Sequence, residues 1–335
     1  MVLPLAILTA SLVSFIVSLI LTPLIANFML KIGHVGVDVH KPRKPKIPES
    51  CGISLIASTI LGLLIMMLFD RGNILKIVSL ILSSSFAGAV GLLDDFRKLD
   101  AKVKTVLTVS AIIPIIYFGT YVPRLILPFI GEARLTLVYL AIIPFALAVT
   151  ANATNMIDVY NGSMVGSMLF AFIALLIASV IKLNNGVGDY FPIYSSAIII
   201  ASLLGYLRYN KYPAKVFNGD TGSLFVGTYF GALAILGRLE IVAVTAFMPQ
   251  IMNGFGIISI IKGLRERREI PVRPVVVDEV SGHISAVKNS NAPLTLAHLL
   301  TLKTPLREDE VVFGFWFLSI IAAILSLIVA YLTYS

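Results

Sequence analysis

The sequence has few of the features that mark soluble, disulfide-bonded or nucleic-acid-binding proteins. Only one of its 335 residues is cysteine, Cys51, so no intramolecular disulfide can form. Charged residues make up 13% of the chain, whereas a soluble domain carries roughly 25%. No basic stretch is interleaved with aromatic residues, which argues against a nucleic-acid partner. No serine stands in a Gly-x-Ser-x-Gly setting and the four histidines lack metal-ligand spacing, so neither an acyl-enzyme nor a histidine metal site is indicated.

Long apolar segments are what the chain has in abundance. Hydrophobic residues make up 58% of it, and the mean hydropathy is +0.94. Apolar runs of about 18 residues recur, and they are continuous rather than alternating, which favours membrane helices over barrel strands. The first run lacks a positive leader and is too long for a simple signal peptide, so we interpret it as the first span. The pattern predicts an all-α polytopic membrane protein with ten transmembrane helices, at residues 3–30, 51–69, 74–93, 105–123, 132–150, 164–182, 191–207, 223–237, 241–261 and 311–333.

Charge distribution predicts the topology. Of the 26 Lys and Arg residues, 20 lie in alternate connections, which are therefore predicted to be cytoplasmic, with both termini outside. Of the 18 acidic residues, 14 lie in the same connections. The positive-inside rule concerns only Lys and Arg and does not explain why acidic residues gather in these connections, so we expect the cytoplasmic loops to form a functional site. These connections are residues 31–50, 94–104, 151–163, 208–222 and 262–310.

No tandem repeat, low-complexity tract or long linker divides the chain, so we expect one integral membrane domain over residues 1–335. The largest polar excursion is 262–310, between the ninth and tenth spans. Within it, residues 275–287 predict a small β-hairpin. Residues 294–302 predict a short amphipathic helix at the membrane interface.

Two adjacent carboxylates, Asp94 and Asp95, end the third apolar run. At the end of a span they are costly unless a cation, a metal or water receives them. Lys98, Lys102 and Lys104 follow closely. Hard oxygen ligands beside ammonium groups suit Mg²⁺ and phosphate. The alternative is that these aspartates cap a helix or are solvated.

Polar residues also mark two later span ends. Asn152, Asn155, Asp158 and Asn161 recur every three residues, which forms a slowly drifting stripe on a helix. Such a stripe offers oxygens to a metal or a nucleotide, or bonds helices to one another. Further along, Asp220 stands between glycines at the start of a span. It is either a simple helix cap or a carboxylate beside free amides that suit a pyrophosphate.

The first and last cytoplasmic connections are rich in basic residues. Asp38 and Lys41 lie in the first, and Arg267 and Arg268 lie in the last. Arginine holds diphosphate well through paired hydrogen bonds. Attraction to anionic lipid headgroups is the alternative for both clusters.

Taken in order, these clusters resemble the motifs of the polyprenyl-phosphate N-acetylhexosamine-1-phosphate transferase superfamily, within glycosyltransferase family 4. The archaeal and eukaryotic branch, which uses UDP-N-acetylglucosamine and dolichyl phosphate, is the more similar one. The bacterial triple-histidine motif is absent, and Met164 stands where the dolichyl branch has an acidic residue. The similar segments are 36–41, 47–53, Asp94-Asp95 with Lys104, Asn152 and Asn155 with Asn161-Gly162, 216–221, 247–253 and 267–271.

The resemblance implies ten helices and a cytoplasmic site that transfers a sugar-1-phosphate from a UDP-sugar to a polyprenyl phosphate. It implies Mg²⁺ as cofactor, with Mn²⁺ as an alternative, held by Asn155 and Asp220. The catalytic residues would be Asp94, Asp95 and Lys104. Substrate binding would fall to Asp38, Lys41, Asn152, Asn161, Gly162, Arg267 and Arg268.

Several alternatives remain open at this stage. The sugar could be another UDP-N-acetylhexosamine, destined for a cell-surface polymer. A secondary transporter is the rival of another class, although the acids lie at span ends and no repeat is found. The sequence leaves a homodimer open. It favours an archaeal cell membrane over the endoplasmic reticulum, with membrane lipid as a partner in either case.

Overall fold

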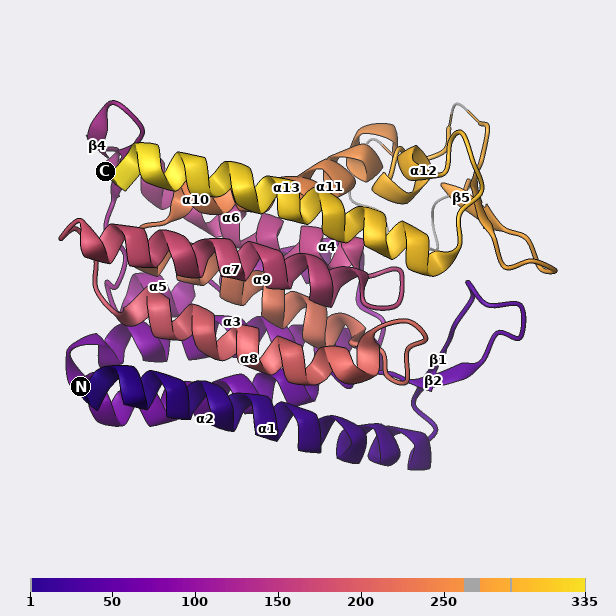
Figure 1. Ribbon diagram of the computed structural model, residues 1–335, viewed down its shortest axis with the longest axis horizontal. Coiled ribbons are helices and arrows are strands. Elements are labelled where there is room, and N and C mark those ends of the chain that lie inside the picture. The colour runs from indigo at the N-terminus through magenta and orange to yellow at the C-terminus, as the bar shows by residue number, and fades with distance from the viewer. Residues whose placement is uncertain (1, 262–271, 290, 335) are drawn as a thin grey trace.

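The computed structural model of the chain describes residues 2–261, 272–289 and 291–334. Long helices lie side by side along the longest axis of the molecule (Figure 1). Both termini lie at one end, and the hairpins β1–β2 and β5–β6 project from the other. We call these the terminal end and the hairpin end. The helices are α1 (Val2–Lys31), α2 (Ile53–Phe69), η1 (Arg71–Asn73), α3 (Ile74–Phe96), α4 (Ala101–Ser110), α5 (Ile113–Tyr117), α6 (Thr136–Ile157), α7 (Ser163–Asn184), α8 (Phe191–Asn210), α9 (Gly219–Gly237), α10 (Glu240–Ala246), α11 (Met248–Ile261), α12 (Leu296–Leu300) and α13 (Glu308–Tyr334).

The chain is a multi-pass membrane protein. Among the described residues, six helices are long and apolar enough to cross a membrane, or seven if the pair α10 and α11, bent by 66°, forms one span. Outward-facing leucine, isoleucine and phenylalanine side chains along α1 and α13 fit a lipid environment. This confirms the helical membrane class, while the count of ten stays a prediction.

Two predicted spans are interrupted, and a proline accompanies each break. The span expected at 105–123 is divided into α4 and α5, and Pro114 stands at the start of α5. The span expected at 241–261 bends between α10 and α11, next to Pro249. Proline cannot donate to the carbonyl four residues earlier, so each helix loses a hydrogen bond there.

Three small antiparallel hairpins complete the fold: β1 (Val35–Val37) with β2 (Lys46–Pro48), β3 (Arg124–Leu127) with β4 (Gly131–Arg134), and β5 (Val275–Val277) with β6 (Ile284–Ala286). The third confirms the hairpin expected at 275–287. The short helix expected at 294–302 is α12, which Thr295 caps by accepting from the His298 amide at 3.1 Å. The first two hairpins were not predicted. Because β4 occupies Gly131–Arg134, the helix expected at 132–150 begins only at Thr136.

Helix α9 lies at the centre of the molecule. Every residue from Thr221 to Gly237 is buried, and the helix packs against α3 and α6. Glycines allow this close approach, because a Cβ at Gly91 of α3 would collide with the backbone of Asp220. The position of Asp220 is therefore set by contact between two helix backbones.

Replacing Gly91 by alanine is expected to separate α3 from α9. The added methyl has no room beside the Asp220 backbone, so we expect the free energy of unfolding to fall by about 1–3 kcal/mol. Thermal unfolding in detergent measures this. The matched control is Gly72→Ala, where the nearest atom to the new methyl is 3.7 Å away. An unchanged melting temperature in Gly91→Ala would contradict the close packing.

Candidate active site

A lysine from α4 joins three oxygen-bearing residues at the hairpin end. Lys104 Nζ donates to Asp94 Oδ2 at 3.1 Å and makes a close ion pair with Asp220 Oδ2. The Asn155 amide, oriented to satisfy its neighbours, accepts from Lys104 Nζ at 3.3 Å and donates to Asp220 Oδ1 at 3.1 Å. We call these four residues the Lys104 cluster. The structure thus brings together side chains from three separate connections.

Local sequence places each member of the Lys104 cluster. Asp94 lies in the last turn of α3, and its Oδ1 accepts from the Leu99 amide at 2.6 Å. Asp100 caps α4 by accepting from the Lys102 amide at 2.8 Å, which puts Lys104 in the first turn. Asp220 lies in the first turn of α9, beside amides that have no partner within the helix.

The Lys104 cluster is shielded from water. The side chain of Asp94 is 4% exposed, that of Lys104 12% and that of Asp220 22%. Salt screens partly buried pairs poorly, so these charges interact strongly with one another and with any anion that enters. The oxygens of Asp94, Asn155 and Asp220 meet around a positive ammonium group. Hard oxygen donors converging on a positive charge form a set that fits Mg²⁺.

Asp95 does not join the Lys104 cluster. Its two oxygens accept from the amides of Asp220 and Thr221 and from the hydroxyls of Thr221 and Ser50. The helix-capping alternative considered for the aspartate pair therefore describes its observed contacts.

A second group surrounds Lys41 of the β1–β2 hairpin. Lys41 Nζ pairs closely with Asp38, donates to Asn161 Oδ1 at 2.5 Å and lies 3.4 Å from Glu308 Oε2. Glu308 Oε1 accepts from the Asn161 amide at 2.8 Å. These four residues are the Lys41 cluster. Glu308 was not among the expected site residues, and its only signal in the sequence is that it opens an acidic triplet at a span end.

The other expected binding residues have different surroundings. Asn152 donates to Thr108 Oγ1 at 3.2 Å and to the Ala148 carbonyl at 2.8 Å, so it bonds α6 to α4, as the interhelical alternative expects. Gly162 has φ +83° and its carbonyl accepts from Trp316 Nε1 at 3.1 Å. Arg267 and Arg268 lie outside the described residues.

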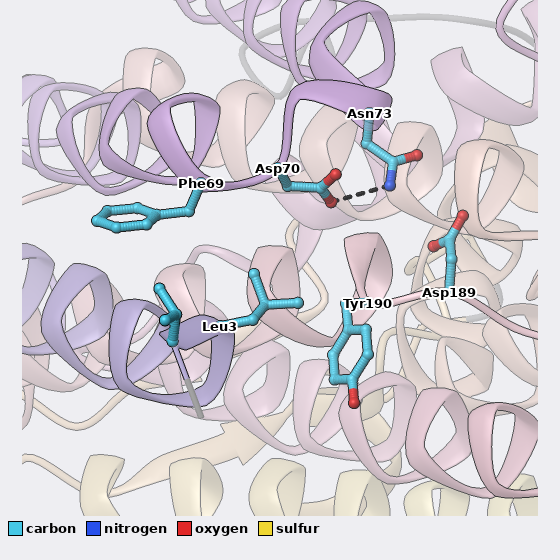
Figure 2. A pocket seen from close by; sticks show the side chains of 7 residues that line it. Leu3, Phe69, Asp70, Asn73, Asp189 and Tyr190 are labelled. Atoms are coloured by element: carbon cyan, nitrogen blue, oxygen red, sulfur yellow. Dashed lines mark hydrogen bonds between the residues drawn. The ribbon is translucent and has the colours of Figure 1, made fainter.

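Cavities lie at both ends of the molecule. One of 260 Å³ opens beside the Lys41 cluster, lined by Asn161, Lys211, Tyr212, Asp309, Val312, Phe313 and Trp316. Another of 260 Å³ lies at the terminal end, between Leu3, Phe69, Asp70, Asn73, Asp189 and Tyr190 (Figure 2). Helix α3 separates Asn73 from Asp94 by about 30 Å, so the terminal cavity is remote from the Lys104 cluster.

Asp158, in the connection 151–163, is hydrogen-bonded to Asn218, in the connection 208–222. Asn218 Nδ2 donates to both of its carboxylate oxygens, at 2.7 and 2.8 Å. Burial raises the pKa of Asp158 to about 7, and the Asn218 hydrogen bonds oppose the rise. The native state therefore holds a proton that the unfolded chain, with a pKa of about 3.9, has already released.

The free energy of unfolding is expected to fall as pH rises from about 4 to 7, by up to about 1.4 kcal/mol per pH unit from this group. The sign follows because the native state binds more protons than the unfolded state in this window. Asp158→Asn should flatten that slope, because the neutral amide does not titrate. Melting temperatures of both proteins across this range measure the slopes. Equal slopes would contradict the raised pKa.

Comparison with known proteins identifies relatives of this chain. The model for glycosyl transferase family 4 matches residues 77–238, which include the Lys104 cluster. A protein of Saccharolobus solfataricus, provisionally named UDP-N-acetylglucosamine–dolichyl-phosphate N-acetylglucosaminephosphotransferase, is 31% identical over 329 residues, 97% of each chain. A protein of the same provisional name from Sulfolobus acidocaldarius is 29% identical over 97% of this chain and 96% of its own. The phospho-N-acetylmuramoyl-pentapeptide-transferase of Thermoanaerobacter sp. is 30% identical over 96% of this chain and 97% of its own. The chain therefore belongs to glycosyl transferase family 4.

Proposed function

We propose that this chain transfers N-acetylglucosamine-1-phosphate from a UDP-sugar to dolichyl or another polyprenyl phosphate, with release of UMP. The reaction would begin lipid-linked oligosaccharide synthesis for N-glycosylation. The single observation that carries the proposal is the Lys104 cluster, with a cation held among carboxylate and amide oxygens at a span end. The provisional names of the two archaeal relatives support the choice of substrates.

The proposal includes ten membrane crossings with the site on the cytoplasmic side. The additional crossings would be α2, α9 and the broken pair α4–α5, besides the bent pair α10–α11. The Lys41 cluster includes two residues of the connection 31–50, which carries the β1–β2 hairpin, and Asp95, next to Asp94 of the Lys104 cluster, accepts from Ser50 at the end of the same connection. Both termini lie at the end of the molecule opposite this hairpin (Figure 1). The cytoplasmic leaflet of an archaeal cell membrane would then present the lipid substrate.

The reaction brings two anions together near hydrocarbon, where their repulsion is strong. Lys104 would hold the diphosphate or the acceptor phosphate, and Asp94 would orient Lys104. Asp220 and Asn155 would hold Mg²⁺, or Mn²⁺, which when bound would neutralise charge on the diphosphate and on the leaving UMP.

The acceptor phosphate is already ionised at pH 7, so little general-base work is needed. One of its oxygens would attack the sugar-bearing phosphorus of the UDP-sugar, forming a new P–O–P bond as the bond to UMP breaks. Positioning of the two phosphates would supply most of the acceleration.

The nucleotide would bind at the Lys41 cluster. Asn161 lines the cavity there, and the aromatic rings of Tyr212, Phe313 and Trp316 offer faces for a flat base. Lys41 Nζ lies 5.0 Å from the Tyr212 ring centre. Asp38 and Glu308 would hold Lys41 in place.

The experiment is transfer by the purified chain in detergent, with radiolabelled UDP-N-acetylglucosamine and dolichyl phosphate. Label in the lipid fraction with release of UMP is the expected result. A panel of UDP-N-acetylhexosamines identifies the sugar. Uptake of intact UDP-sugar into vesicles without UMP would favour a transporter instead.

A further inference from the structure

Asp95 is next to Asp94 in the chain but faces different partners. Successive residues of an α-helix point about 100° apart, so the two adjacent aspartates in the last turn of α3 point in different directions. Asp94 Oδ2 accepts from Lys104. Asp95 Oδ1 accepts from the Asp220 amide at 2.8 Å, and its Oδ2 accepts from the Thr221 amide at 3.2 Å.

Two hydroxyls complete the surroundings of Asp95. Thr221 Oγ1 and Ser50 Oγ each donate to Asp95 Oδ2 at 2.7 Å. Four donors therefore engage both oxygens of a residue that is only 9% exposed. The first amides of a helix lack partners within it, and a carboxylate there also interacts favourably with the helix dipole. Asp95 thus caps α9 from a neighbouring helix.

The backbone around this cap leaves little freedom. Gly219 has φ +65°, and a Cβ built on it would collide with Asp95 Oδ2. One helical turn before Asp95, Gly91 contacts the backbone of Asp220. The last turn of α3 thereby holds the Asp220 backbone on two sides, which directs its carboxylate toward Lys104 and Asn155.

We propose that Asp95 is a positioning residue, which holds the start of α9 so that Asp220 faces Lys104, and that it does not touch the acceptor phosphate. The expected change in kcat rests on the proposed function, whereas the expected loosening of the start of α9 does not. The experiment therefore has a kinetic arm and an independent arm.

In the kinetic arm, Asp95→Asn should lower kcat by about 10- to 100-fold, as loss of a partner behind a functional ligand does. The KM for dolichyl phosphate should stay within about twofold of the wild-type value, because binding of the acceptor is untouched. Thr221→Val, which retains both carboxylates, should lower kcat less and combine with Asp95→Asn less than additively. A raised acceptor KM with unchanged kcat would mean that Asp95 contacts the acceptor, and would overturn the proposal.

In the independent arm, amide hydrogen exchange of residues 219–223 should be faster in Asp95→Asn than in the wild type. The matched control is Asp189→Asn, which replaces a carboxylate by a neutral amide at a similar place, where Asp189 Oδ1 accepts from the Phe191 amide at 3.0 Å at the start of α8. That control should leave turnover and exchange of 219–223 unchanged. Unchanged exchange in Asp95→Asn would overturn the positioning role. An inactive wild type with faster exchange in Asp95→Asn would refute the proposed function alone.

Discussion

Asp220→Ala is expected to lower kcat at least about 100-fold while the protein still inserts and folds. Asp220 is the carboxylate that faces both Lys104 and Asn155. Asp95 is a poor substitute, because both of its oxygens are engaged at the start of α9, and Asp94 already pairs with Lys104 and accepts from the Leu99 amide. Without Asp220, the site would lose the carboxylate that we propose as the main ligand of a divalent cation. Initial rates of UMP release across a range of Mg²⁺ concentrations measure the effect.

Folding of the variant is checked by its melting temperature in detergent. The matched control is Asp189→Ala, an acid at the terminal end that pairs with Lys76 at 2.6 Å. It should retain wild-type turnover. If Asp220→Ala keeps the wild-type dependence on Mg²⁺, the assignment of Asp220 as a metal ligand is wrong.

Lys104→Ala is expected to lower kcat by a factor similar to that for Asp220→Ala. Unlike Asp220→Ala, it should also change how strongly Mg²⁺ raises the melting temperature. The change leaves Asp94 and Asp220 close together without their shared cation. Removing one partner of a buried ion pair costs roughly 3–5 kcal/mol. We therefore expect a lower melting temperature without divalent metal and a larger stabilisation by Mg²⁺ than in the wild type, because a bound cation would replace the lost charge.

Use of the acceptor should also weaken in Lys104→Ala, since the variant lacks the positive charge that we propose holds one of the two phosphates. The matched control is Lys102→Ala, an exposed lysine on the same helix. It should behave as the wild type in both melting and turnover. Wild-type kinetics for both substrates in Lys104→Ala would exclude the proposed role.

The sequence singled out all four residues of the Lys104 cluster, because carboxylates and amides at span ends are costly without a polar partner. It also predicted the β5–β6 hairpin and α12, where turn and cap residues act locally. It grouped Asp95 with Asp94, whereas in the structure Asp95 bonds to the start of α9, because adjacency in sequence conceals the 100° rotation between helical neighbours. Glu308 escaped notice because its partners, Lys41 and Asn161, are distant in the chain.

The amino-acid sequence alone determined the membrane class, the positions of the main helices and the residue types of the site. These follow from hydrophobic periods, proline and capping residues, which act over a few turns of chain. Tertiary structure decided which carboxylate meets Lys104, which one caps α9, and which residues join Lys41. The first two outcomes depend on how closely α3 and α9 approach, which the contacts at Gly91 and Gly219 permit. The third depends on how the β1–β2 hairpin, Asn161 and the start of α13 meet.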